Sequence, residues 1–480
     1  MKGTTLYSCF SSESTVSDHF APRIGVVLAA LLIIHSEPKS LAAAPIEETG
    51  RADVEGLSDA DDGAIVPDAP EGLAEINAAR AALAEGDIES CRNKLRAAYA
   101  KSPNLPPPKL MLARLMLGAG QIRLGRQLLE EVAQSHPNHP DLYLLFGKLA
   151  LADGHATDAA LHFEKALSLA IPTNWNDGQR AFLKRACLEG QTSVAERRGD
   201  WDEAADLYQQ QIEARPKDAN LRDRFAMVLF QAGEDDRAFE QFDLSFLQDA
   251  SMNPPEISMA VMEVRTGDYR KADQWFAKAV EKHSDNPAVH FEHSIAMLFQ
   301  DRTQAAAASA ARVAELGMNS PLLTMHRGLI AMQQADSAAA EKYFTQLLDS
   351  SPKNFGAMAK LALVMVEQDD SGKQNKAVEL AEAAAKLNDN STEVAAVLGW
   401  IYYRTGQKKK GRTLLQAAAA HPANDPLPLF LYARVLYMEE ATSDAEQAAK
   451  LLRQRLEQPG MFPLRPAAKK WLASVVGDAE

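Results

Sequence analysis

The 480-residue sequence contains little of what several common classes of protein require. It has only three cysteines, too few to build a disulfide framework, and no CxxC pair for a zinc or redox site. No phosphate-binding loop, dinucleotide-binding glycine loop, nucleophile elbow or HExxH motif occurs. We therefore expect a protein that is not an enzyme and that needs no cofactor.

Basic residues are outnumbered by acidic ones, 51 against 65. The formal net charge is −14, and nine acidic residues against one arginine lie between residues 45 and 71. A nucleic-acid partner requires a basic surface, so this class of partner is disfavoured. The same segment has few large apolar side chains to repay the entropy of ordering, and 45–71 is therefore predicted to be an acidic, disordered linker.

Long apolar runs are missing, with one short exception near the N-terminus. Residues 24–34 form an apolar run, preceded by Arg23 and followed, after a polar stretch, by Leu41 and the small residues at 42–44. Eleven residues are too few to cross a bilayer as a helix but suit the core of a secretory signal. The pattern predicts a signal peptide over 1–44 and an exported protein, periplasmic or extracellular. The alternative is a short buried or interfacial helix, in which case the protein is cytoplasmic.

Small residues, by contrast, recur at a fixed period along most of the chain. A marker residue returns every 34 residues within three runs: Gly86, Gly120 and Gly154; Gly199, Gly233, Gly267, Asp301 and Ala335; Gly372, Gly406 and Glu440. Five residues after each marker stands a second small residue: Cys91, Gly125, Ala159, Ala204, Ala238, Ala272, Ala306, Ala340, Ala377, Gly411 and Ala445. Such pairs let two antiparallel helices approach closely, and a period of this length is typical of a helical solenoid.

The pattern resembles the tetratricopeptide repeat, a helix–turn–helix unit of 34 residues, over 72–457. The best matching unit supplies the aromatic, large and small residues of that family in order: Tyr143, Phe146, Gly147, Ala159, Phe163 and Ala166. Asp301, Ala335 and Glu440 depart from it, because they replace the turn glycine. The resemblance implies an all-α, right-handed superhelical solenoid of about eleven repeats. Residues 458–480 are predicted to be a C-terminal capping helix and tail whose apolar side covers the last repeat.

An eleven-residue insertion near 171–181 interrupts the period between the third and fourth repeats. It contains Pro172, Trp175 and Gly178. One interpretation is a loop that contacts a partner. The other, which we favour, is a lengthened first helix with Trp175 packed on it.

His290 and His293 are candidate metal ligands, because they are one helical turn apart. No HExxH motif accompanies them, and both histidines occupy places that large residues normally fill in the repeat. We therefore predict no metal site.

The resemblance also implies where partners bind. In this family the first helix of each repeat lines a concave groove, with the ninth position of the repeat pointing into it and the fifth position beside it. The predicted partner-binding residues are the basic Arg80, Arg114 and Lys148, the apolar Ile257, Val261, Phe291, Ile295, Met325 and Leu329, and Trp400. An exposed apolar strip usually marks a peptide or helix site. Two interpretations stay open, since the strip can also be the solenoid's own packing and the basic trio an ordinary solvated face.

These features together predict a non-catalytic scaffold that binds extended or helical segments of partner proteins in its groove, in the cell envelope. A membrane-associated complex is compatible with this prediction, and the oligomeric state is left open. The alternative is an accessory or regulatory subunit of an enzyme or secretion complex, for example in polysaccharide or cell-wall synthesis. A third hypothesis, an enzyme with its chemistry in the groove, lacks the clustered titratable residues that it needs.

Overall fold

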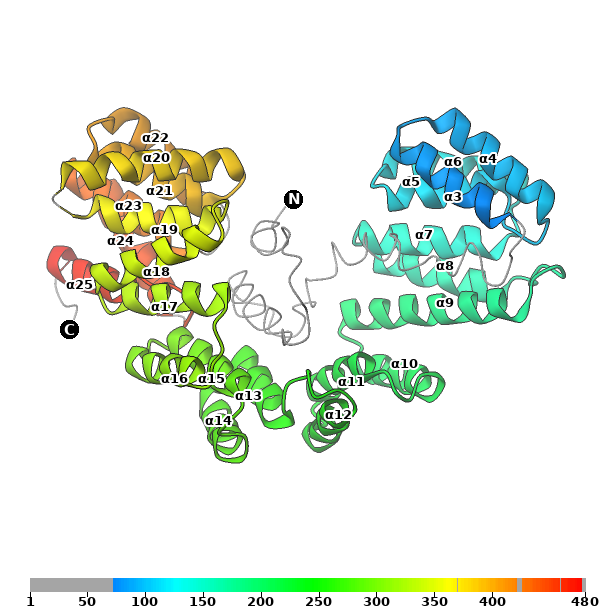
Figure 1. The fold of residues 1–480 in the computed structure, drawn as a ribbon, viewed down its shortest axis with the longest axis horizontal. Coiled ribbons are helices and arrows are strands. Elements are labelled where there is room, and N and C mark those ends of the chain that lie inside the picture. The colour runs from blue at the N-terminus through cyan, green and yellow to red at the C-terminus, as the bar shows by residue number, and fades with distance from the viewer. Residues whose placement is uncertain (1–71, 369, 421–424, 458, 477–480) are drawn as a thin grey trace. The chain divides into compact units, whose positions relative to one another are not determined.

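The computed structural model describes residues 72–368, 370–420, 425–457 and 459–476 (Figure 1). This part of the chain contains twenty-three α-helices and no strand. It divides into two compact units, which we call the N-terminal unit (residues 72–248) and the C-terminal unit (residues 249–476). The predicted signal peptide and acidic linker lie outside the described residues. None of the described helices is both long enough and apolar enough to cross a membrane.

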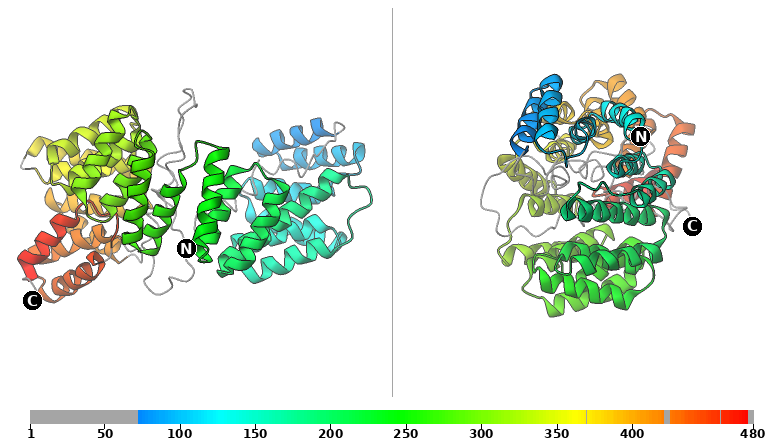
Figure 2. Two further views of the ribbon diagram at one scale, coloured as in Figure 1. Left: turned by 90° about the horizontal axis from the view of Figure 1, so that it is seen from below. Right: turned by 90° about the vertical axis from the view of Figure 1, so that its right-hand side faces the viewer.

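The N-terminal unit consists of five helix pairs. Their bounds are α3 Leu73–Ala84, α4 Ile88–Lys101, α5 Pro108–Gly118, α6 Ile122–Ser135, α7 Pro140–Ala152, α8 Ala156–Ser168, α9 Asp177–Arg198, α10 Trp201–Ala214, α11 Ala219–Gln231 and α12 Asp235–Gln248. The two helices of each pair lie against each other, and successive pairs stack (Figure 2).

The C-terminal unit consists of six helix pairs and a final helix. Their bounds are α13 Pro255–Thr266, α14 Tyr269–Lys282, α15 Pro287–Phe299, α16 Thr303–Glu315, α17 Pro321–Gln333, α18 Ser337–Ser350, α19 Phe355–Val366, α20 Ser371–Leu387, α21 Thr392–Arg404, α22 Lys408–Ala419, α23 Pro426–Met438, α24 Thr442–Leu456 and α25 Arg465–Val476. The predicted all-α repeat class is thereby confirmed.

Small residues sit where the two helices of a pair cross. A Cβ atom built on Gly147 of α7 would lie 2.5 Å from the ring of Phe163 in α8, well inside van der Waals contact. Gly328 of α17 has the same relation to Phe344 of α18. The small residues therefore recur in the sequence because the paired helices approach closely at those positions.

The three residues that replace the turn glycine adopt the glycine conformation. Asp301, Ala335 and Glu440 have φ angles of 61°, 58° and 57°, in the left-handed region that Gly86 and Gly120 also occupy. For a residue with a Cβ atom this backbone conformation costs about 1 kcal/mol. The repeat geometry is thus kept at these three turns at a local cost.

The insertion between the third and fourth repeats lengthens a helix. Helix α9 has 22 residues, and Trp175 just before it is buried. Asn174 Nδ2 donates to the Pro103 carbonyl at 2.8 Å, and Gln179 Nε2 donates to the Asn104 carbonyl at 2.9 Å. The second interpretation of the insertion is correct, and the segment also ties α9 to the distant α4–α5 loop.

The last helix, α25, does more than cover the final repeat as predicted. It packs against α24 and also reaches α17, beside which it lies in Figure 1. It contacts helices that are far apart in the sequence because residues 459–464 turn the chain back toward the α15–α16 turn. The simple capping role expected from the sequence is therefore incomplete.

Candidate functional site

The predicted apolar strip is not an exposed surface. Ile257, Phe291, Ile295 and Trp400 are fully buried, and Met325 and Leu329 are only 9% and 7% exposed, while Val261 is half-buried against the same core. The first helices of neighbouring repeats pack side by side, α13 against α15 and α15 against α17. The solenoid's own packing explains this strip, and the exposure that made it a candidate site is absent.

The predicted basic trio is not a continuous solvent-facing patch either. Arg114 is 6% exposed, its guanidinium 3.6 Å from the Asp141 carboxylate and 5.7 Å from the centre of the Phe182 ring. Arg80 and Lys148 are half-buried. The central residue of the trio is engaged inside the N-terminal unit, so the expected cationic groove is not formed there.

The two histidines of α15 face different partners. His290 Nε2 lies 2.9 Å from the Ser284 carbonyl, and His293 Nδ1 lies 2.9 Å from Ser309 Oγ. Within the described residues no group of three His, Cys, Asp or Glu side chains is placed to hold a metal ion.

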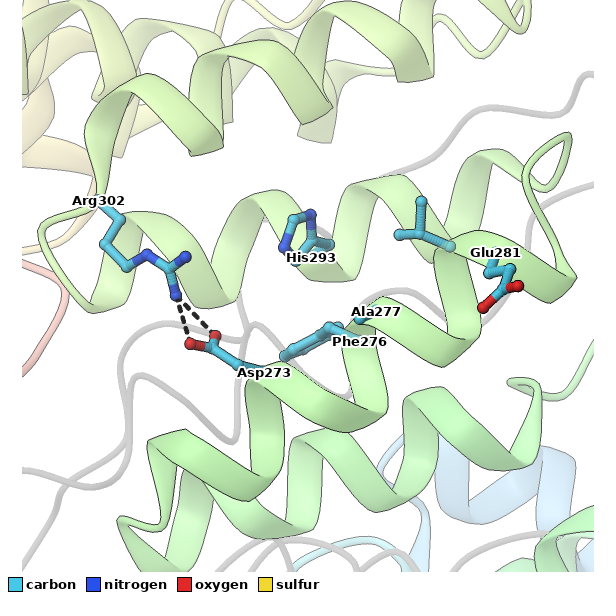
Figure 3. A pocket seen from close by; sticks show the side chains of 7 residues that line it. Asp273, Phe276, Ala277, Glu281, His293 and Arg302 are labelled. Atoms are coloured by element: carbon cyan, nitrogen blue, oxygen red, sulfur yellow. Dashed lines mark hydrogen bonds and ion pairs between the residues drawn. The ribbon is translucent and has the colours of Figure 1, made fainter.

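A first cavity of about 470 Å³ opens between α14 and α15 (Figure 3). Arg302 Nη1 donates to both carboxylate oxygens of Asp273, at 2.6 and 2.8 Å. The His293 ring lies 5.3 Å from that of Phe276, and burial together with the nearby Arg302 charge lowers the pKa of His293 below its ordinary value. Its imidazole is therefore neutral near pH 7. Arg302 and Asp273 are paired with each other, and the His293 imidazole is hydrogen-bonded to Ser309. The lining of this cavity therefore favours no charged ligand.

A second cavity, of about 310 Å³, lies on the face of the first helices of the C-terminal unit. We call it the arm cavity, because α25 forms one of its walls. Its lining is Met332, Ala335, Ser337, Ala340, Leu363, Val364, Glu367, Phe430, Arg434, Leu464, Ala467 and Trp471. It combines an apolar floor with two charged residues at its edge.

The charged edge of the arm cavity is an arginine–glutamate cluster. Glu367 accepts hydrogen bonds from Arg434 Nη1 at 2.7 Å, Arg404 Nη1 at 3.0 Å and Trp400 Nε1 at 2.9 Å. The Arg434 guanidinium also stacks 4.1 Å from the centre of the Trp400 ring. Burial alone would raise the pKa of Glu367, but the hydrogen bond from Arg434 and the charges of both arginines outweigh it and lower that pKa. Two cations and one anion leave a surplus of positive charge.

The sequence pointed to part of this cluster. Trp400 was a predicted groove residue, and Arg434 occupies the same ninth position one repeat later. Glu367 and Arg404 each stand four residues after a ninth position, one helical turn away on the same face. The sequence signal for Glu367 and Arg404 is a pair of oppositely charged residues, each one helical turn after a ninth position.

The residues before and within α25 are held by Asp301, at the α15–α16 turn. Arg465 Nε lies 3.2 Å from Asp301 Oδ1, and Lys469 Nζ lies 3.1 Å from Asp301 Oδ2. The Gly460 N–H donates to the Phe299 carbonyl at 3.2 Å, and Gln333 Nε2 donates to Asp301 Oδ1 at 3.0 Å. The carboxylate that replaces the turn glycine is thus the docking point of the C-terminal segment.

Antiparallel helix pairs that stack at a 34-residue period, each crossing at small residues, define an α-helical repeat protein. Models of the tetratricopeptide repeat match residues 82–149 and 187–222. Together with the repeat geometry of the described residues, these matches support a tetratricopeptide-repeat family for the chain. A comparison with curated protein sequences finds no match.

Solved structures that match this chain include three at low sequence identity. Yeast Tom70 is 13% identical, with a TM-score of 0.34 over 84% of this chain and 95% of that one. Cut9–Hcn1 of the APC/C is 12% identical, with a TM-score of 0.39 over 84% and 90%. A tetratricopeptide repeat protein from Parabacteroides merdae is 16% identical, with a TM-score of 0.30 over 62% and 100%. The family assignment comes from the sequence models and the helix-pair geometry instead of from these superpositions.

Repeats of this family support a general role. The chain is a protein-interaction scaffold, and its fold is one that typically carries no catalysis of its own.

Proposed function

We propose that this scaffold binds a short segment of a partner protein at the arm cavity of its C-terminal unit. The observation that carries the proposal is the combination of an open apolar cavity of about 310 Å³ with a cluster of surplus positive charge at its edge. Pockets of this kind take a side chain by shape and orient it by a few polar groups.

The lining defines the chemistry of the bound segment. Leu363, Val364 and Phe430 offer an apolar surface to one bulky aliphatic or aromatic side chain. Burying such a side chain contributes about 1.5–3 kcal/mol. Arg434 offers a guanidinium to a carboxylate beside it, and charge-assisted hydrogen bonds of this type are the strong ones. The segment therefore combines a bulky apolar residue with a neighbouring Asp or Glu.

A peptide selection on the full chain tests this function. Short random peptides are displayed and selected on the native protein, and the affinities of the winners are then measured by fluorescence anisotropy. Ala467→Phe places a ring in the cavity and is expected to weaken binding about tenfold. Ala473→Phe is the matched control, because Ala473 is exposed on the same helix and does not line the cavity.

Arg434→Gln gives the second readout of the selection. It removes one cation from the cavity edge, so the preference for an acidic residue beside the apolar one is expected to disappear. Helicity measured by circular dichroism checks that each variant is folded. Peptides that bind Ala467→Phe as tightly as Ala473→Phe would show that the cavity is not the binding site.

We further propose that this scaffold works after export, in the cell envelope. The proposal is supported by the charge and apolar pattern of residues 1–44. Expression of the complete chain with a C-terminal tag, followed by fractionation and N-terminal sequencing, tests it. A cytoplasmic protein that retains Met1 would contradict export.

A further inference from the structure

The segment 459–476, which we call the C-terminal arm, occupies the face on which the arm cavity lies. Its helix α25 begins beside the α15–α16 turn of the same unit, where Asp301 holds Arg465 and Lys469, and ends against α23, where Tyr437 Oη donates to the Val475 carbonyl at 2.8 Å. The two basic residues are four apart, so one helical turn presents both to a single carboxylate. The arm shows directly what kind of segment this face accepts.

The apolar side of the arm is seated on aromatic residues. Phe462 and Leu472 are buried, and the Trp471 ring meets those of Phe430 and Tyr437 edge-on, both at 5.9 Å between ring centres. The Phe462 ring meets Phe430 in the same manner at 6.1 Å. Edge-to-face ring pairs stabilise the contact beyond what the buried area alone contributes. The arm therefore docks as an amphipathic helix whose anchors are aromatic on one side and basic at Asp301.

The arm does not fill its seat. The arm cavity lies between the first helices and the arm residues Leu464, Ala467 and Trp471, and Ala467 contributes only a methyl group to it. Unfilled apolar space forfeits dispersion contacts, so a helix with a larger side chain at the place of Ala467 would fit better. Of the two basic anchors of the arm, Arg465 is buried and Lys469 is exposed to solvent, so a better-fitting helix meets the weaker of the two at Lys469.

We propose that the seat of the C-terminal arm is an interaction surface for an amphipathic helix of a partner protein, for which the arm is an intramolecular competitor. The partner helix carries two basic residues four apart, which replace Arg465 and Lys469 at Asp301. It carries a bulky apolar residue where the arm has Ala467. This inference rests on the proposed function, because the partner helix takes the place of the arm and its bulky apolar residue contacts the part of the cavity lining that stays, Leu363, Val364 and Phe430.

A partner helix binds only if it outcompetes the arm, which is already attached to the chain. A tethered segment has an effective concentration on the order of millimolar, so a free copy of the same segment competes poorly. Weakening the arm in the chain should therefore raise the affinity for a free arm peptide. This is the property that separates a displaceable arm from a permanent part of the core.

The first measurement uses the full chain and a fluorescent synthetic peptide of residues 459–476. In the chain, Lys469→Glu places a second anion beside Asp301 and loosens the arm. We expect the peptide to bind this variant about three- to tenfold tighter than the native chain. Lys470→Glu is the control with the same charge change on the same helix, since no ion pair of Lys470 is formed among the described residues. It should bind like the native chain.

Two further changes test the chemistry of the seat. Adding Asp301→Asn to the Lys469→Glu chain removes the carboxylate that the peptide needs, so the gain in affinity should be lost. A peptide with Ala467→Leu should bind the Lys469→Glu chain more tightly than the native peptide does. Hydrogen exchange of residues 459–476 should be faster in Lys469→Glu than in Lys470→Glu.

The outcomes separate this inference from the proposed function. Equal peptide affinities for the native, Lys469→Glu and Lys470→Glu chains, with unchanged exchange in the arm, would refute a displaceable arm. A gain that survives Asp301→Asn would refute the basic pair. Failure of the proposed function appears elsewhere, in selected peptides that ignore Ala467→Phe.

Discussion

Each of the two units has a tie between segments that are distant in sequence, and the two ties differ in chemistry. In the N-terminal unit the tie is neutral, since Asn174 and Gln179 donate amide hydrogen bonds to carbonyls of the α4–α5 loop. In the C-terminal unit it is ionic, since Asp301 holds Arg465 and Lys469. Repeats otherwise contact mainly their neighbours. Each unit therefore has its own contact between distant segments. We expect the neutral contact of the N-terminal unit to be insensitive to salt and the ionic contact of the C-terminal unit to be sensitive to it.

Buried glutamates show a second contrast. Glu196 of the N-terminal unit accepts from Tyr208 Oη at 2.6 Å and pairs with Arg224 at 3.4 Å. Glu292 of the C-terminal unit is 1% exposed, and neither of its carboxylate oxygens has a hydrogen-bond partner among the described residues. A satisfied buried group stabilises, whereas an unsatisfied one costs free energy. The same residue type has opposite effects in the two interiors.

The largest expected effect tests whether the repeats of the two units are equivalent. Phe163 packs on Gly147 and Gly190, and Phe344 packs on Gly328, both in full burial. Truncating either to alanine should cost about 3–5 kcal/mol of unfolding free energy, measured by urea denaturation with hydrogen exchange to locate the loss. Leu161→Ala, at an exposed position of α8, should change it by less than about 0.5 kcal/mol. If only one of the two substitutions lowered the free energy of unfolding by this amount, the repeats of the two units would not be equivalent.

The buried glutamates should respond with opposite signs. Glu196→Met is expected to destabilise its unit by about 1–3 kcal/mol, because Tyr208 loses its acceptor, and Glu292→Met is expected to stabilise its unit by a similar amount. Urea denaturation at pH 7 measures both. Two changes of the same sign would mean that the contrast between the two interiors is wrong.

The Glu292 effect should also depend on pH. Burial raises the pKa of Glu292 well above its ordinary value, so the folded chain keeps a proton that the unfolded chain loses above about pH 4.3. Stability of the native protein relative to Glu292→Met should therefore fall as pH rises from that value toward the folded pKa. The free-energy difference between the two proteins, measured at several pH values, gives this slope. A constant difference would contradict it.

The two ties should differ in their response to salt. Asn174→Ala and Lys469→Ala are each expected to weaken their tie by up to about 1 kcal/mol at low salt. At about 1 M salt the Lys469 effect should shrink, because charges are screened within roughly 3 Å, while the Asn174 effect should remain. Hydrogen exchange of the α4–α5 loop and of α25 reports each tie separately. If salt changed the effects of both substitutions equally, the two ties would not differ in chemistry as described.

The smallest effect concerns two turns of the C-terminal unit. Ala335→Gly relieves a left-handed conformation and should stabilise by up to about 1 kcal/mol. Asp301→Gly relieves the same strain but loses the ion pairs of the arm, so its net gain should be smaller or absent. Thermal denaturation compares them. A larger gain for Asp301→Gly would show that the arm contributes nothing through that carboxylate.

The fold class followed from local constraints that can be read along the chain. The 34-residue period of small residues marks helix crossings, as Gly147 against Phe163 shows, and the marker residues mark the turns. Each constraint involves residues within one repeat, so sequence spacing alone reveals it. Even the departures at Asp301, Ala335 and Glu440 kept the phase, because a single residue tolerates the left-handed region at modest cost.

Only the tertiary structure decided which surfaces are available. Ile295 and Leu329 were predicted to point into a groove, but burial depends on the neighbouring first helix, which the position within a repeat does not specify. The contact of Lys469 with Asp301 spans 168 residues, and the Glu367–Arg434 pair spans 67. Contacts at such separations arise from how the repeats stack, and no periodicity within one repeat encodes them. The sequence by itself determined the repeat, and the stacking of repeats determined the arm, its seat and the cavity beneath it.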